Sequence, residues 1–167
     1  MLVMMLLKEG KEMIDEISSE KKKILFVDDQ WCIEDKQCIL RSDYGQLRRE
    51  GYDFLYETAF DESRGRYITE KVVQRVVQDS PSIVILDMDF CKDPFDTRNF
   101  KSQTGFGRTI LARLMQEDSE LPVVIHSSSN DKALKADCLR IGAREWLEKK
   151  ATYEELKRVV EDHGRFR

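Results

Sequence analysis

Few residues in this chain interrupt regular structure, and no stretch stays apolar for long. Only 3 of the 167 residues are proline and 8 are glycine, which is not the composition of a linker or a low-complexity tail. No apolar run approaches the roughly 20 residues that span a bilayer. The apolar start, Met1–Leu7, lacks a basic leader and a cleavage site. We therefore expect one folded domain that makes no use of a membrane.

The patterns of structural zinc sites and disulfide frameworks are also missing. The chain has four cysteines without a C-x-x-C pair and only two histidines to join them. The cysteines are Cys32, Cys38, Cys91 and Cys138. Free thiols in a reducing cytoplasm are the better expectation. The net charge of −4 lacks the basic excess of a general nucleic-acid binder, so no nucleic-acid partner is expected.

What the sequence does contain is an alternation of short apolar runs with helical patterns, which indicates a parallel α/β sheet. Apolar residues make up 41% of the chain, enough to build a core. Strands are expected at residues 24–27, 52–57, 82–86, 122–125 and 144–147. Helices are expected at residues 35–50, 67–78, 105–117, 130–142 and 152–164. The prediction is a doubly wound, five-stranded parallel sheet.

Several segments outside these elements have their own expectations. Residues 88–104 are polar and are predicted to form a long irregular loop. Residues 1–20 are interpreted as an N-terminal extension to a domain of residues 21–167, either an amphipathic helix or a frayed terminus. Asn130 is expected to cap the fourth helix, and Thr152 to begin a capping box.

Polar side chains follow four of the five expected strands. Asp28 and Asp29 end the first, Asp87 the third, Ser127 the fourth and Lys149 the fifth. In doubly wound sheets, ligands bind beyond the carboxyl ends of the strands. Three carboxylates gathered there would repel one another, each pair by about 4 kcal/mol at close range. Such a cluster is stable if a divalent cation neutralises it, for which Mg²⁺ with its preference for oxygen ligands is best suited, or if one carboxyl group stays protonated.

The remaining groups suit phosphoryl chemistry. Ser127 offers a hydroxyl donor and Lys149 a compact positive charge, and both could hold phosphoryl oxygens. A carboxylate can then act as the nucleophile in an in-line displacement, with positioning and charge compensation supplying the catalysis.

Four segments in this order resemble response regulator receiver domains, the CheY-like superfamily. They are residues 24–30, 83–87, 122–128 and 142–149. The first resembles the opening strand with its acidic pair, and the second the strand that presents the phospho-acceptor aspartate. The third and fourth are similar to the switch hydroxyl and to the Gly-Ala turn, aromatic residue and lysine. The resemblance implies the flavodoxin-like (βα)5 receiver fold.

The resemblance also implies a role for each site residue. Asp87 would accept the phosphoryl group, Ser127 and Lys149 would contact it, and Ser127 and Trp146 would form the switch. The implied Mg²⁺ ligands are Asp28 through water, Asp29, Asp87 and the backbone carbonyl of Asp89. A histidine kinase or phosphotransfer protein would donate the phosphoryl group, and a downstream protein would bind in response.

Two alternatives stay open. One is a pseudo-receiver, a binding module of the same fold without phosphorylation, which residues 88–104 suggest. The other is a haloacid-dehalogenase-like phosphatase, because Asp87 and Asp89 form an Asp-x-Asp motif after an apolar strand. Chain order favours the receiver, which is not an enzyme acting on other molecules, because the acidic pair comes first. His126 is expected to face away from the site rather than to act in it.

Overall fold

Five parallel strands form the central sheet of the computed structural model, which describes residues 22–28, 46–61, 63–91 and 102–165. The strands are β1 (Lys22–Val27), β2 (Tyr52–Glu57), β5 (Ile83–Leu86), β8 (Val123–Ser127) and β9 (Glu145–Glu148). Their order across the sheet is β2-β1-β5-β8-β9. This is the doubly wound order of flavodoxin-like folds, so the predicted fold class is confirmed.

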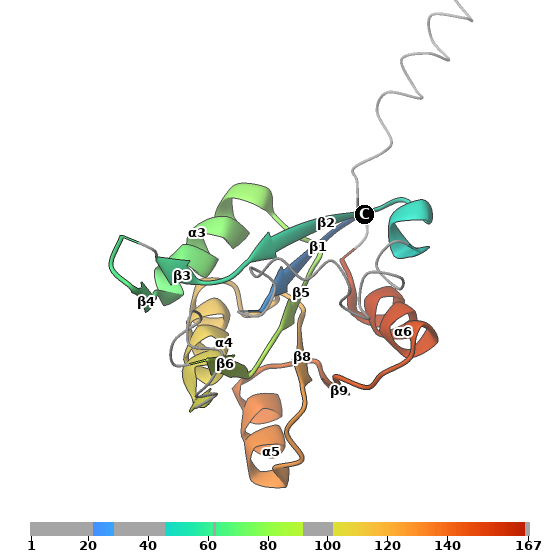
Figure 1. Cartoon of the computed structure of the whole chain (residues 1–167). Coiled ribbons are helices and arrows are strands. Elements are labelled where there is room, and N and C mark those ends of the chain that lie inside the picture. The colour runs from blue at the N-terminus through green and yellow to red at the C-terminus, as the bar shows by residue number, and fades with distance from the viewer. Residues whose placement is uncertain (1–21, 29–45, 62, 92–101, 166–167) are drawn as a thin grey trace, which may run out of the picture.

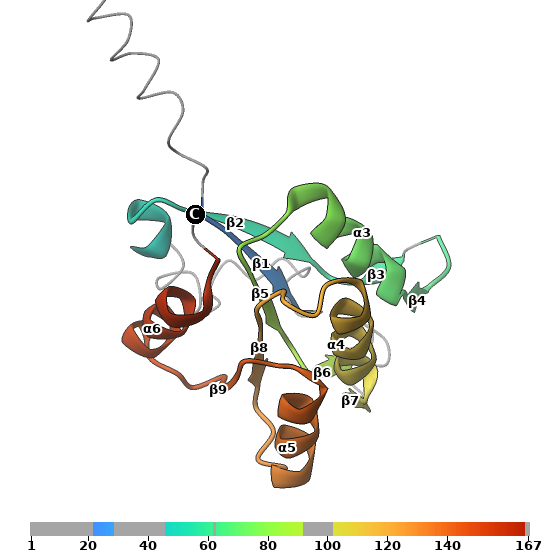
Figure 2. The same cartoon turned by 180° about the vertical axis from the view of Figure 1, so that it is seen from behind.

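Helices cover both faces of this sheet (Figures 1 and 2). They are α3 (Thr69–Asp79), α4 (Phe106–Glu117), α5 (Lys132–Ile141) and α6 (Tyr153–His163). Helices α3, α4 and α5 bury apolar side chains with one face of the strands, and α6 and Leu47 with the other. The central strands β5 and β8 are buried throughout, which explains the unbroken apolar sequence of β5 and the apolar run Val123–Ile125 that begins β8.

Of the two predicted helix N-terminal caps, one is confirmed and the other lies one residue further along the chain. The Oδ1 of Asp131 accepts hydrogen bonds from the backbone N–H groups of Ala133 and Leu134, at 2.8 and 3.1 Å. The expected cap at Asn130 is therefore wrong by one residue. Thr152 and Glu155 form the predicted capping box of α6.

Two antiparallel hairpins lie where the sequence predicted a helix start and a loop. Strands β3 (Phe60–Asp61) and β4 (Arg66–Tyr67) form the first, so α3 begins at Thr69 rather than at residue 67. Strands β6 (Asp89–Cys91) and β7 (Ser102–Thr104) form the second. The prediction of an irregular loop at residues 88–104 is therefore wrong for these strands. Three-residue strands are too short to leave an alternation that sequence reading detects.

Aromatic rings join the two hairpins. The Phe90 ring on β6 packs edge-to-face against Tyr67 on β4 and Phe106 on α4, with centroid distances of 5.4 and 5.2 Å. Phe90 is fully buried. Such edge-to-face pairs stabilise beyond the area they bury, so β6 is fixed to the body of the domain beside the end of β5.

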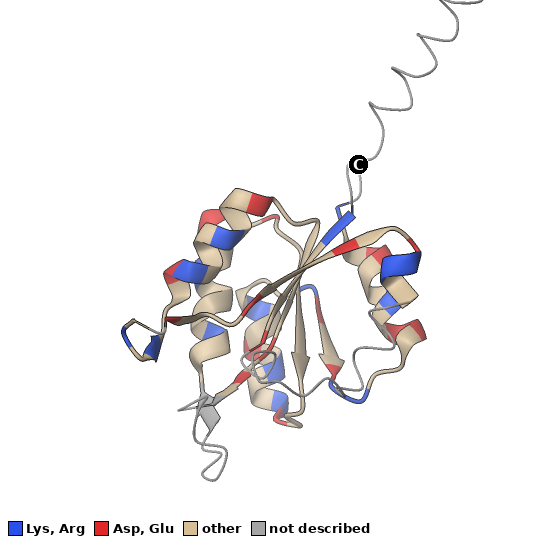
Figure 3. Cartoon of the chain, turned by 45° about the horizontal axis from the view of Figure 1, so that its top comes forward, with Lys and Arg blue, Asp and Glu red and all other residues tan. Residues whose placement is uncertain are grey.

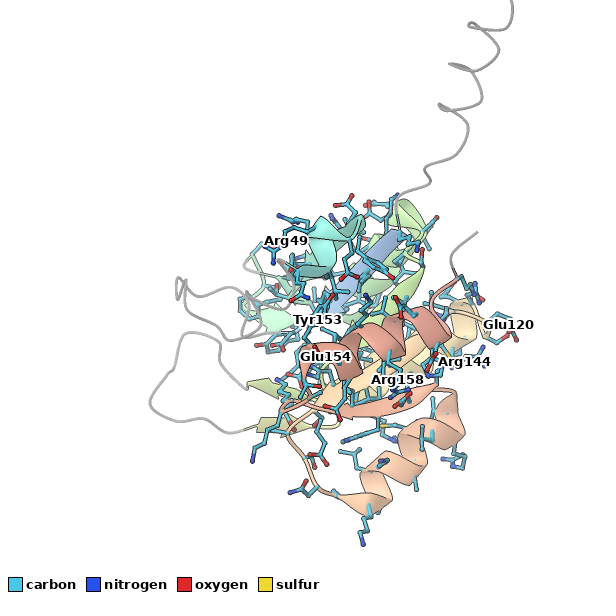
Figure 4. The ribbon with its side chains drawn as sticks, turned by 90° about the vertical axis from the view of Figure 1, so that its right-hand side faces the viewer. Arg49, Glu120, Arg144, Tyr153, Glu154 and Arg158 are labelled. Atoms are coloured by element: carbon cyan, nitrogen blue, oxygen red, sulfur yellow. The ribbon has the colours of Figure 1, made fainter. Side chains whose placement is uncertain are left out.

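Ion pairs hold α6 on the edge strand β9. Arg158 donates to Glu145 on β9 at 2.5 Å. The Tyr153 hydroxyl ties α6 to another segment, because it donates to Glu50 at 2.7 Å. Figure 4 labels Arg158 and Tyr153 on α6. Charged residues lie mainly along the helices and at strand ends, while the middle of the sheet is free of them (Figure 3). None of the described helices combines the length and apolar character that a membrane crossing requires.

Several predictions fall outside the described residues. These are the N-terminal extension at residues 1–20, most of the helix at residues 35–50, and Asp29. Of that helix, residues 46–49 are described and are helical, ending before Gly51 as expected.

Candidate functional site

The carboxyl ends of β1, β5 and β9 bring three of the predicted site residues together. Asp28, Asp87 and Lys149 each follow the last residue of one of these strands. Backbone hydrogen bonds continue the ladder at this edge: the Asp87 N–H donates to the Val27 carbonyl at 2.9 Å, and the Lys149 N–H to the Ser127 carbonyl at 3.0 Å. The sheet itself therefore sets the positions of these side chains.

The Lys149 ammonium lies between two carboxylates. Its Nζ is 2.7 Å from Oδ2 of Asp87 and 3.3 Å from Oδ2 of Asp28. The Asp87 side chain is almost entirely buried, with 1% exposed, whereas Lys149 keeps 22%. A single cation thus compensates two carboxylates at the end of the central strand.

This compensation is incomplete. Burial and repulsion from Asp28 raise the pKa of Asp87 to about 7, against the lowering effect of Lys149. Burial lowers the pKa of Lys149, but attraction to Asp28 and Asp87 outweighs it, so that the net shift is upward. The lysine therefore stays charged, while the Asp87 carboxylate needs more positive charge nearby to be fully ionised at neutral pH.

The carboxylate oxygens at this edge of the sheet are ligands of the kind that Mg²⁺ binds. Asp28 and Asp87 provide the hard oxygen ligands that this cation prefers, and the raised pKa of Asp87 indicates that a further positive charge would be favourable here. Within the described residues, no group of three His, Cys, Asp or Glu side chains is placed to hold a metal ion. The third predicted carboxylate, Asp29, lies outside them.

Ser127 lies at the end of β8 but its hydroxyl does not bond Asp87. It donates instead to Oδ2 of Asp89 at 2.9 Å, and Ser128 donates to the same oxygen at 3.1 Å. The Asp89 backbone N–H donates to Oδ1 of Asp87 at 3.1 Å. The receiver resemblance gives Asp89 a role only through its carbonyl, and nothing in the sequence singles out Ser128, because hydroxyls in a strand-to-helix loop are common.

The other predicted residues are buried. Trp146 on β9 is 8% exposed and belongs to the core on the α3–α5 face. Its side chain already lies inward, so its function as a switch remains a prediction. His126 is 6% exposed, and strand alternation places it on the face opposite Ser127. It lies close enough to Lys149 and Asp28 for their charges to act on its pKa, so the expectation that it faces away from the site stays a prediction.

Gly107 is a residue that sequence reading missed. A Cβ at this position in α4 would collide with the carbonyl oxygen of Asp87 and lie 2.8 Å from the Cα of Met88. Helix α4 thus approaches the backbone of the acceptor loop so closely that only hydrogen fits. The available signal was a glycine inside a helical pattern, which is unfavourable unless packing requires it.

Replacing Gly107 with alanine tests this contact. In an open helix the change would stabilise the fold by up to about 1 kcal/mol. Here we expect a loss of about 1–3 kcal/mol, because the methyl group has to displace the backbone at Asp87 and Met88. Urea unfolding of the variant and the wild type measures the difference, and a gain in stability would contradict the close approach.

The arrangement of sheet and helices is similar to that of response regulator receiver domains among solved structures, so the comparison gives the same fold. The chain is similar to the receiver domain of NtrX from Brucella abortus, with 24% identity and a TM-score of 0.58 over 84% of this chain and 96% of that one. It is also similar to a response regulator receiver domain from Clostridium thermocellum, with 21% identity and a TM-score of 0.59, covering 84% and 92%.

A CheY-like receiver domain from Methanospirillum hungatei gives the same result at 16% identity, with a TM-score of 0.58 over 84% of this chain and 91% of that one. No protein-family model matches the sequence, and the curated proteins gave no match. At these identities the likeness establishes the fold, and function has to be argued from the site.

Proposed function

We propose that this chain is a phospho-acceptor receiver domain of a two-component or phosphorelay system, with Asp87 as the acceptor. The observation that carries the proposal is the Lys149 ammonium, which contacts the carboxylates of Asp87 and Asp28 at the carboxyl edge of the sheet. An almost fully buried carboxylate with a paired lysine and a second carboxylate nearby is a costly arrangement for stability alone. A site that binds a doubly charged phosphoryl group would account for this cost.

In the transfer step, an Asp87 carboxylate oxygen attacks the phosphorus of the donor. A P–O bond to Asp87 forms while the bond from phosphorus to the leaving group breaks, and the leaving group departs with the electron pair. Lys149 offsets the negative charge that collects beside Asp87. Mg²⁺, when bound by Asp28, Asp29, Asp87 and the Asp89 carbonyl, supplies further positive charge.

The donor in the cell would be a phosphohistidine on a kinase or a phosphotransfer protein. The output would be altered binding to a protein effector in the cytoplasm, through a two-state change that the phosphoryl group biases. Ser127 and Trp146 are the residues assigned to that change, as the resemblance to receiver domains suggests.

Intact mass after incubation with acetyl phosphate and Mg²⁺ tests the proposal. We expect the wild type to gain the mass of one phosphoryl group and Asp87→Asn to gain none, because the amide cannot act as the nucleophile. Asp162→Asn, a change at an exposed carboxylate of α6, is the matched control and should be labelled like the wild type.

Each alternative has its own outcome in this experiment. A wild type that gains no mass, like Asp87→Asn, would favour the pseudo-receiver, for which the Ser127 hydroxyl bonded to Asp89 rather than to Asp87 is an argument. Steady turnover of a phosphate ester would favour the phosphatase instead.

A further inference from the structure

A second group of contacts lies beside the acceptor, around the carboxylate of Asp89. Oδ2 of Asp89 accepts the hydroxyls of Ser127 and Ser128, at 2.9 and 3.1 Å. The Ser127 Oγ also accepts the backbone N–H of Ser129 at 3.1 Å. Ser127 is fully buried. Its hydroxyl donates one hydrogen bond, to Asp89, and accepts one, from Ser129, and neither involves Asp87.

Asp89 links the two halves of the site. Its backbone N–H donates to Oδ1 of Asp87 at 3.1 Å, and its carboxylate binds the hydroxyl of Ser127. Hydrogen bonds to an ionised acceptor are about twice as strong as neutral ones. The carboxylate of Asp89 therefore holds the serine firmly in this arrangement.

We propose that Asp89 is a positioning residue that retains Ser127 in the unphosphorylated arrangement and thereby sets how readily the site switches. This rests on the proposed function, together with the contact between Ser127 and the phosphoryl group that the resemblance to receiver domains implies. The Ser127 hydroxyl has one hydrogen to donate, so the Asp89 carboxylate and a phosphoryl group on Asp87 compete for it. Ser127 has to release Asp89 before it can bind the phosphoryl oxygen.

The expected effect on phosphorylation follows from the strength of the hydrogen bond between Ser127 and Asp89. A hydrogen bond to a charged group changes an equilibrium about tenfold or more. Asp89→Asn keeps the shape of the side chain and an accepting oxygen but removes the charge. We expect the acetyl phosphate concentration that gives half-maximal phosphorylation, followed by intact mass, to fall about tenfold in this variant.

A double-mutant cycle separates retention of Ser127 from simple charge repulsion. In a Ser127→Ala background there is no hydroxyl to release, so Asp89→Asn should have no further effect. An equal effect in both backgrounds would mean that Asp89 acts on the phosphoryl group by its charge alone, and would overturn the inference. Ser128→Ala is the control, because it leaves the bond between Ser127 and Asp89 in place.

A second measurement needs neither phosphorylation nor metal. The Ser129 amide bonds the Ser127 hydroxyl, so its hydrogen exchange reports whether that hydroxyl is held. In the unphosphorylated protein we expect faster exchange of this amide in Asp89→Asn and unchanged exchange in Ser128→Ala. Unchanged exchange in Asp89→Asn would overturn the inference.

The two proposals fail in different ways. If no variant gains phosphoryl mass, the proposed function is wrong, and with it the competition for Ser127. If the wild type is phosphorylated but Asp89→Asn shows the same half-maximal concentration, only the role of Asp89 is wrong.

Discussion

We expect Lys149→Met to lower the free energy of unfolding by about 3 kcal/mol at pH 8, the low end for a broken buried ion pair. The methionine fills much of the same volume but leaves the Asp28 and Asp87 carboxylates without the cation that lies 3.3 and 2.7 Å from them. The loss should be smaller at pH 5. The folded pKa of Asp87, about 7, lies above its unfolded value, so its contribution is present at low pH and is lost as pH rises through 7. Without Lys149, the stability that Asp87 loses as pH rises becomes larger.

Urea unfolding at both pH values, in buffer with a chelator to exclude divalent cations, measures this effect. Lys157→Met is the matched control. Its ammonium pairs with Glu50 at 2.8 Å but with about a third of each side chain exposed, so the expected loss is much smaller than for Lys149→Met. An equal loss for Lys149→Met at pH 5 and pH 8 would show that packing, rather than charge, is responsible.

The second large effect concerns pH and the buried imidazole on β8. Burial, helped by the Lys149 charge, lowers the pKa of His126 to about 4, against an opposing effect of Asp28. The unfolded chain takes up a proton near pH 6.5 whereas the folded one does not, so stability falls as pH drops from about 6.5 to 4. The shift corresponds to a loss on the order of 3 kcal/mol.

His126→Leu, which has no titratable group, should remove this part of the pH dependence. The measurement is the difference between the unfolding free energies of variant and wild type at pH 4 and pH 7, which cancels the other titrating groups. His163→Leu is the control: that ring is 25% exposed and bonded to Glu145, and its loss should leave the fall between pH 6.5 and 4 in place. Parallel pH profiles for wild type and His126→Leu would contradict a neutral buried His126.

The middle of the sheet was predictable from the sequence because its central strands, β5 and β8, are buried on both sides. An unbroken apolar run such as Ile83–Leu86 fits a central parallel strand, and the polar residue that follows it marks the carboxyl edge. The meeting of Asp87 and Lys149 follows from topology alone, since parallel strands present their ends at one edge. The same argument placed Asp28 beside them, and the contacts agree.

The parts that sequence reading missed depend on short or tertiary features. Strands of two or three residues leave no periodic pattern, which is why the hairpin of β6 and β7 was read as a loop. The bond between Ser127 and Asp89 joins residues 38 positions apart, and no local pattern encodes it. Residue 107 has to be glycine because the backbone carbonyl oxygen of Asp87, from another segment, lies where a Cβ would be.

The aromatic contacts of β6 indicate which of the two residues, Ser127 or Asp89, moves when their hydrogen bond breaks. Phe90, the neighbour of Asp89, is fully buried between the rings of Tyr67 and Phe106, so displacing it would open a cavity in the core. Asp89 is therefore the stationary partner. When the bond breaks, the displacement has to be taken up on the other side, by the segment that leads from β8 into α5. Any surface that changes shape with the state of the site should then lie along α5 and not along the β3–β4 hairpin.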